Sequence, residues 1–129
     1  MQRTAAGAPA AALLRRYARE ASRAEITLRI VGLAEGRRLN KRFRRKNYAT
    51  NVLSFPYGGG SGDIVLCHPV IAREARAQRK TLRAHYAHLV VHGALHLRGL
   101  DHLRRADAAR MERAEIRILR RLGFSDPYV

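Results

Sequence analysis

Three histidines in the second half of the chain have the spacing of a metal site. His92 and His96 are four residues apart in an apolar segment that we expect to be helical, so their side chains project from one face, about 40° apart around the axis. Gly99 follows where helices commonly end, and a turn there would bring His102 back to the pair. Three neutral imidazoles suit zinc and leave a fourth position for water. The sequence therefore predicts one zinc ion held by His92, His96 and His102.

The metzincin zinc peptidases share this spacing, in the motif H-E-x-x-H-x-x-G-x-x-H. Here Gly93 occupies the position of the glutamate that serves those peptidases as general base, which argues against peptide hydrolysis. The predicted reagent is a metal-bound water, because zinc lowers the pKa of such a water from 15.7 towards about 7. We expect Asp101 and His88 to orient the ligands by hydrogen bonds. A turn-stabilising role for Asp101 is the alternative, and His88 and the nearby His85 could instead be metal ligands or core residues.

The charge of the chain predicts an anionic partner. Twenty-six Lys and Arg face ten Asp and Glu, a formal net charge of +16 at pH 7. Nucleic acid is the first candidate and an acidic membrane surface the second. Residues 37–46 hold seven basic side chains, with Phe43 among them, and this mixture suits the phosphates and exposed bases of a flexible single strand. A solvated helix face is the alternative. The predicted RNA contacts are Arg37, Arg38, Lys41, Arg42, Arg45, Lys46 and Tyr48.

The elements that must position these residues are strands with helices before, between and after them. Periodicity and capping signals predict helices over 10–21, 34–44, 69–80, 82–98 (capped by Thr81) and 106–122, and strands over 25–31, 52–55 and 64–67. We expect Pro56 to end the second strand and the glycine run 58–62 to form a flexible turn. Three or four strands among these helices predict one mixed domain over residues 1–129.

Other residues receive structural interpretations. The single cysteine, Cys67, allows no intrachain disulfide and is expected to be buried. Met111 is expected in the core, and Glu112 and Glu115 are expected to pair with nearby arginines. Because no apolar stretch is long enough to span a bilayer, we expect a cytoplasmic protein with no membrane association.

Two longer motifs carry a family resemblance. Residues 92–102 read H-G-x-L-H-L-x-G-x-D-H, and residues 50–56 read T-N-V-L-S-F-P. Together with G-D-I-V-L-C at 62–67, L-G at 122–123 and D-P-Y at 126–128, they resemble the YbeY family of bacterial endoribonucleases. The likeness covers about residues 25–128.

This resemblance implies a single-strand-specific, zinc-dependent endoribonuclease that acts on ribosomal RNA. It further implies that the enzyme matures the 3′ end of 16S rRNA and acts in late ribosome quality control, with the small ribosomal subunit as its partner. One Zn²⁺ per protein subunit is also implied. The implied fold is α+β and zincin-like, with a mixed, mostly four-stranded sheet packed with about five helices. Arg44 matches an arginine near the family's active site and becomes a catalytic candidate, whereas Asn47 stands where an acidic residue is usual.

Three alternatives remain open on the sequence alone. In one, the ribose 2′-hydroxyl is the nucleophile and zinc acts mainly as a Lewis acid, which would leave a 2′,3′-cyclic phosphate. In another, the chain is a metallohydrolase of a different substrate. In the third, it is a non-catalytic ribosome-assembly factor with structural zinc, which a closed four-ligand site would favour.

Overall fold

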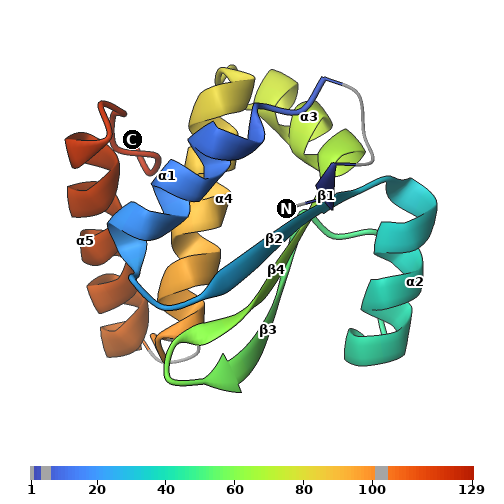
Figure 1. Ribbon diagram of the computed structural model, residues 1–129. Coiled ribbons are helices and arrows are strands. Elements are labelled where there is room, and N and C mark those ends of the chain that lie inside the picture. Colours follow the sequence, from blue (N-terminus) through green and yellow to red (C-terminus); the bar gives the residue numbers. More distant parts are fainter. Residues whose placement is uncertain (1, 4–6, 101–104) are drawn as a thin grey trace.

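The structure is a computed structural model that describes residues 2–3, 7–100 and 105–129. Strands and helices alternate at first along this part of the chain, and two consecutive strands followed by three consecutive helices complete it (Figure 1). The helices are α1 (Ala11–Ala21), α2 (Leu33–Arg44), α3 (His68–Ala77), α4 (Leu82–Leu97) and α5 (Arg105–Arg121). The strands are β1 (Gln2–Arg3), β2 (Ile26–Val31), β3 (Val52–Gly58) and β4 (Ser61–Cys67).

The strands form one mixed sheet in the order β1-β2-β4-β3. β2 and β4 are parallel, with Ile26 opposite Gly62, and β3 and β4 form an antiparallel hairpin, with Val52 opposite Leu66. The expected α+β class with five helices is confirmed for the described residues. Three strands of six or seven residues make up nearly all of the sheet, and a fourth strand is counted only with the two-residue β1.

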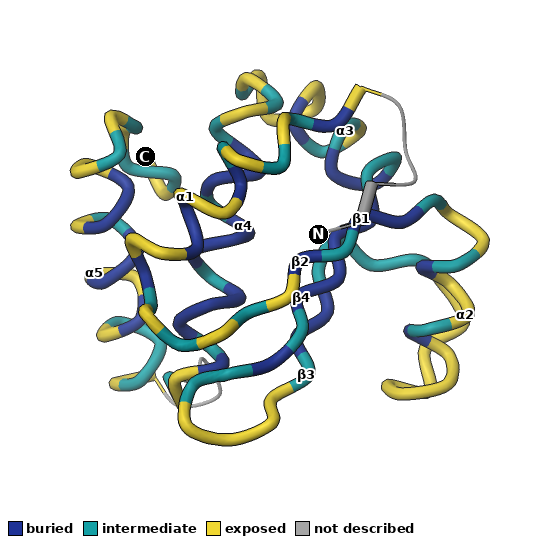
Figure 2. Tube along the Cα trace, in the orientation of Figure 1, coloured by how far each residue is buried: buried dark blue, intermediate teal, exposed yellow. Residues whose placement is uncertain are grey.

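The sheet separates two layers of helices (Figure 1). Successive β4 side chains point to opposite faces, so Ile64 enters the main core with α1, α4 and α5, and Val65 enters a smaller core with the inner side of α2. α4 is buried along most of its length, whereas most of α2 is exposed (Figure 2). As expected, Met111 and Cys67 are buried, at 1% and 2% exposure.

Several element boundaries differ from expectation. Pro56 does not end β3, because β3 is an edge strand where a residue without an N–H can be tolerated. The strand continues to Gly58 through an irregularity in register, and the glycine run forms the hairpin turn and the start of β4. α3 ends at Ala77 rather than Lys80, and Arg79 beyond it has a left-handed backbone, with φ of 56°. β1 was not predicted.

The predicted cap of the metal-site helix is confirmed. The Thr81 hydroxyl accepts a hydrogen bond from the Ala84 backbone N–H at 3.1 Å, which satisfies one of the unpaired donors of the first turn. The helix then runs unbroken to Leu97, and Gly99 follows with φ of 96°. Among the described residues, no helix is both long and apolar enough to cross a bilayer.

Candidate metal centre and its surroundings

The two predicted helical ligands lie side by side on α4. His92 and His96 are one turn apart on this helix, and both are half-buried. The third predicted ligand, His102, and its neighbour Asp101 lie outside the described residues. Within the described ranges alone, no three His, Cys, Asp or Glu side chains form a group that could hold a metal ion. His92 and His96 are the two of the three predicted ligands that lie within the described ranges.

A buried carboxylate from α5 binds the first histidine. Glu115 is fully buried, and its Oε2 accepts a hydrogen bond from His92 Nδ1 at 2.7 Å. Its Oε1 lies 3.3 Å from His88 Nε2 and accepts a hydrogen bond from the Tyr128 hydroxyl. The expectation that Glu115 pairs with an arginine is wrong, because its side chain points inwards to α4.

Electrostatics keep Glu115 ionised. Burial alone would raise the pKa of this carboxyl group, but hydrogen bonds from His88, His92 and Tyr128 outweigh it and lower the pKa to about 2. The same contact, added to burial, raises the pKa of Tyr128. At neutral pH Glu115 is therefore an acceptor only, and it fixes His92 with the proton on Nδ1.

This arrangement fits a metal ligand. Metal-bound histidines commonly donate their second ring N–H to a carboxylate, which sets the tautomer and the orientation of the ring. With Nδ1 bound to Glu115, the atom of His92 that would bind an ion is Nε2. Zinc accepts neutral imidazole nitrogen, so His92 and His96 are suitable donors for it.

The other two histidines of α4 have different surroundings. His88 Nε2 lies within 3.3 Å of both Glu115 and Tyr128, so it belongs to the hydrogen-bond network behind His92. His85 is buried against α3, where its Nε2 lies 2.9 Å from Glu74 Oε1. Burial lowers the pKa of His85, although Glu74 opposes this effect. His85 is therefore not placed as a ligand.

Close packing explains why a glycine follows His92. A Cβ atom at Gly93 would lie 3.0 Å from Ile64 Cδ1 and 3.2 Å from Ser54 Oγ. At such distances the Ile64 or Ser54 side chain must move, so a larger residue would disturb the packing of α4 against β3 and β4. The position that carries the general base in the peptidases is thus an interior packing position here.

Arg44 reaches the same region from the other side of the sheet. It lies in the last turn of α2, and its Nη2 donates a hydrogen bond to the Ser54 carbonyl at 3.2 Å. The Ser54 side chain faces Gly93, which precedes His96 by one turn. The catalytic candidate is therefore anchored on the edge strand that packs against the histidine helix.

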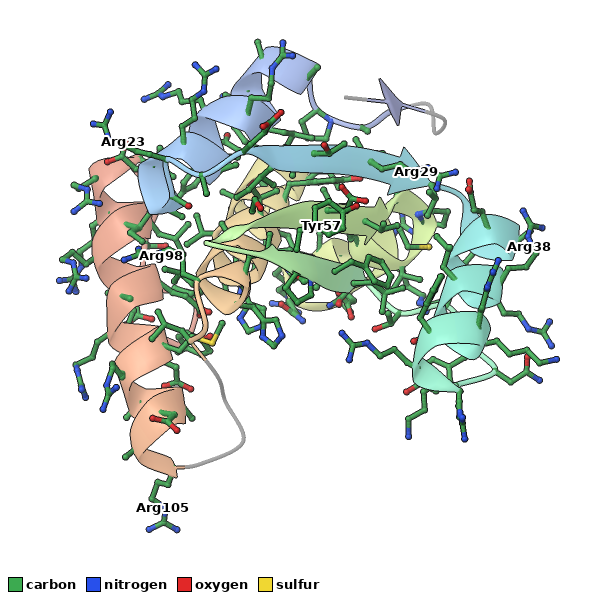
Figure 3. All side chains as sticks on the ribbon, turned by 60° about the horizontal axis from the view of Figure 1, so that its bottom comes forward. Arg23, Arg29, Arg38, Tyr57, Arg98 and Arg105 are labelled. Carbon is green, nitrogen blue, oxygen red and sulfur yellow. The ribbon has the colours of Figure 1, made fainter. Side chains whose placement is uncertain are left out.

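The predicted RNA contacts gather on α2 and the segment after it. All seven basic residues of 37–46 are exposed, and Arg38 points away from the sheet (Figure 3). Arg37 Nε donates to Asn47 Oδ1 at 2.9 Å, and Tyr48 is 57% exposed. The Phe43 ring is also half exposed, with the Arg42 guanidinium 5.3 Å from its centroid.

Comparison with known proteins decides the family. The family model for the endoribonuclease YbeY matches residues 5–123. The chain belongs to the YbeY family. The YbeY endoribonuclease of Bordetella pertussis is 60% identical over 111 residues, which cover 82% of this chain and 71% of the relative. That of Aromatoleum aromaticum is 55% identical over 128 residues, which cover 95% and 83%. The resemblance seen in the motifs is confirmed.

The YbeY fold is also found in a solved structure. The solution structure of TM1509 from Thermotoga maritima superposes with a TM-score of 0.60 and 23% sequence identity, and the alignment covers 98% of both chains. The helices and sheet that place His92, His96 and Arg44 therefore belong to a known arrangement.

Proposed function

We propose that this chain is a metal-dependent endoribonuclease that cleaves single-stranded RNA during ribosomal RNA processing. The relatives above are named as endoribonucleases of the YbeY family. The observation that carries the proposal is the hydrogen bond from His92 to the ionised, buried Glu115, one turn before His96. A histidine prepared in this way on a close-packed helix has the surroundings of a metal ligand.

The proposed ligands are His92, His96 and His102, with one zinc ion per subunit. When bound, the ion would supply a Lewis acid and would lower the pKa of a coordinated water. Glu115 holds the His92 ring, and His88 and Tyr128 hold Glu115. Asp101 is proposed to orient His102. In this respect we infer a zincin-like arrangement, with the metal helix packed on a mixed sheet.

The remaining residues would bind and position the substrate. Arg44 would offset negative charge on the phosphate at the cut, because its guanidinium lies at the edge strand β3, which packs against α4. The exposed basic side chains of α2, together with Tyr48, would bind the neighbouring phosphates and bases of a single strand. We propose that the substrate is the 3′ end of 16S rRNA on the small ribosomal subunit, in the cytoplasm, and that the chain also acts in ribosome quality control.

A cleavage assay tests this function directly. Single-stranded and duplex RNA of the same sequence are incubated with the native protein, with His96→Ala and with chelator-treated protein, and zinc is measured by mass spectrometry. We expect cleavage of the single strand by native protein only, with zinc lost from His96→Ala. The control is His68→Gln. His68 begins α3 and its Nδ1 lies 2.7 Å from the Tyr86 hydroxyl, so this variant removes a histidine that is not a proposed ligand. Cleavage that survives both His96→Ala and chelation would refute the metal-dependent proposal.

A further inference from the structure

A cavity lies between the sheet and α2, on the face of the sheet opposite α4. It has a volume of about 330 Å³, is open to solvent, and is walled by Leu39 and Phe43 of α2 and by Phe55 and Tyr57 of β3. Tyr57 lies over the sheet in Figure 3. The cavity touches neither His92 nor His96, so the metal centre does not account for it.

The walls present aromatic rings that the core does not use. Phe43 is 52% exposed and Tyr57 is 69% exposed, although large apolar rings are normally buried. Phe43 and Phe55 meet edge to face, with ring centroids 5.1 Å apart, and this contact holds both rings at the cavity. Exposed rings at fixed positions are the feature that proteins use to stack unpaired bases.

The floor of the cavity supplies hydrogen-bonding groups. Thr27 lies opposite Asp63, and Arg29 lies two residues further along the same face of β2. Asp63 accepts a hydrogen bond from the Tyr57 hydroxyl. The Arg29 Nη2 pairs with Glu35, but its Nε is buried and has no hydrogen-bond partner among the described residues. Arg29, Thr27 and Asp63 therefore place charged and polar side chains along the floor of the cavity.

Two residues that line the cavity are sequence neighbours of the proposed catalytic edge. Phe43 immediately precedes Arg44, and Phe55 immediately follows Ser54, whose carbonyl binds Arg44. Because successive strand residues point to opposite faces, the Ser54 side chain faces α4 while Phe55 faces the cavity. The single edge strand β3 therefore separates the cavity from the metal helix. A strand of RNA crossing this edge at Arg44 would carry its next base to the cavity.

We propose that this cavity binds one unstacked nucleobase of the RNA substrate, next to the phosphate held by Arg44. The inference rests on the proposed function for the identity of the ligand as RNA. Aromatic walls suit the face of a base, and the donor and acceptor groups of Arg29, Thr27 and Asp63 suit its edge. The basic side chains of α2 beside the cavity favour a polyanion over a neutral or acidic protein segment.

The test measures RNA binding rather than cleavage. A fluorescein-labelled single-stranded RNA of eight nucleotides is mixed with the full-length protein, and affinity is taken from stopped-flow anisotropy before cleavage begins. Tyr57→Leu and Phe43→Leu remove a ring but keep an apolar side chain, and we expect each to bind about 5- to 150-fold more weakly. Tyr57→Phe keeps the ring and should restore nearly native affinity. Circular dichroism checks that each variant is folded.

A scan with abasic RNA separates base binding from general affinity. Removing the base at one position should weaken binding to the native protein, and the same removal should have much less effect on Tyr57→Leu. Native RNA affinity in both leucine variants would overturn the proposal and would instead favour a protein occupant of the cavity. The proposal would also be overturned if Tyr57→Leu lost as much affinity for the abasic strand as for the intact strand. If the leucine variants bind normally while the native protein still cleaves RNA, only this inference fails.

Discussion

Replacing Glu115 with glutamine should weaken zinc binding by removing the charge that fixes the tautomer of His92. The carboxylate accepts from His92 at Oε2 and from His88 and Tyr128 at Oε1, but an amide offers one acceptor oxygen and one donor nitrogen. If the amide nitrogen faces His92, Nδ1 must become the acceptor and Nε2 takes the proton, which blocks the ligand atom. If the amide is flipped, its oxygen still accepts from His92 Nδ1, and His88 Nε2 and the Tyr128 hydroxyl must accept from the amide nitrogen instead of donating. In both orientations the negative charge that favours a proton on His92 Nδ1 is lost.

The magnitude follows from the same contacts. A pKa of about 2 for Glu115, against an ordinary 4.5, corresponds to a preference of about 3 kcal/mol for the charged carboxylate in the folded protein. Loss of one hydrogen bond to a charged group costs about 1.5–3 kcal/mol, so the metal-free variant should be less stable by that amount. Loss of a carboxylate behind a ligating histidine typically lowers metal affinity about 10- to 100-fold.

Two measurements check this prediction. Zinc affinity is determined by competition with a coloured chelator, and the stability of the metal-free protein by urea unfolding. The matched control is Glu112→Gln, which changes an exposed glutamate on the same helix and should leave both quantities near native values. Native zinc affinity in Glu115→Gln would refute the claim that this carboxylate prepares His92. An equal loss in Glu112→Gln would show that helix charge, rather than the hydrogen bond, is responsible.

Three further predictions concern other parts of the molecule. Arg44→Ala should lower the rate of RNA cleavage at least about 100-fold with zinc content unchanged. Its control is Arg110→Ala, which changes an exposed arginine of α5 and should leave cleavage normal. Loss of zinc together with activity in Arg44→Ala would contradict this prediction. Gly93→Ala should lower the free energy of unfolding, measured with urea, by about 1–3 kcal/mol, because the new Cβ would lie 3.0 Å from Ile64 Cδ1. This loss is expected although alanine has the higher helix propensity. A more stable variant would disprove the packing argument. Burial lowers the folded-state pKa of His85 below 6.5, so the unfolded chain binds more protons in acid and the free energy of unfolding should fall from pH 7 to 5. His85→Gln should reduce that slope, and an unchanged slope would refute the assignment.

Local signals made helix α4, which carries the predicted metal ligands, predictable from the sequence. Thr81 at its start, an apolar run, and Gly99 after its end are features of a few neighbouring residues, and the structure confirms a helix over Leu82–Leu97. The side-by-side placement of His92 and His96 follows from helix geometry alone. The role of Arg44 had a different origin, because only the family resemblance singled it out among seven basic residues.

Contacts between distant residues were not predictable in the same way. Glu115 binds His92 across 23 residues and Tyr128 joins His88 across 40 residues, so no local rule links them. A usable signal was nevertheless present. Glu115 lies four residues after Met111 and three before Ile118, on the buried face of α5. A carboxylate on such a face must have buried partners, and the histidines of α4 were candidates for that role.

The edge strand β3 shows why sheet position matters as much as composition. A proline such as Pro56 normally ends a strand. Only the sheet order shows that β3 has a free edge, where a missing N–H is tolerated. An open edge invites pairing with other chains, and here Arg44 covers part of it by binding the Ser54 carbonyl. The same guanidinium is the proposed phosphate contact, so RNA must compete with or share this hydrogen bond. Because β3 presents Ser54 to the metal helix and Phe55 to the aromatic cavity, one strand of RNA crossing this edge would meet both sites. A duplex could not place an unstacked base in the cavity, so this arrangement would give the proposed preference for single strands a structural cause.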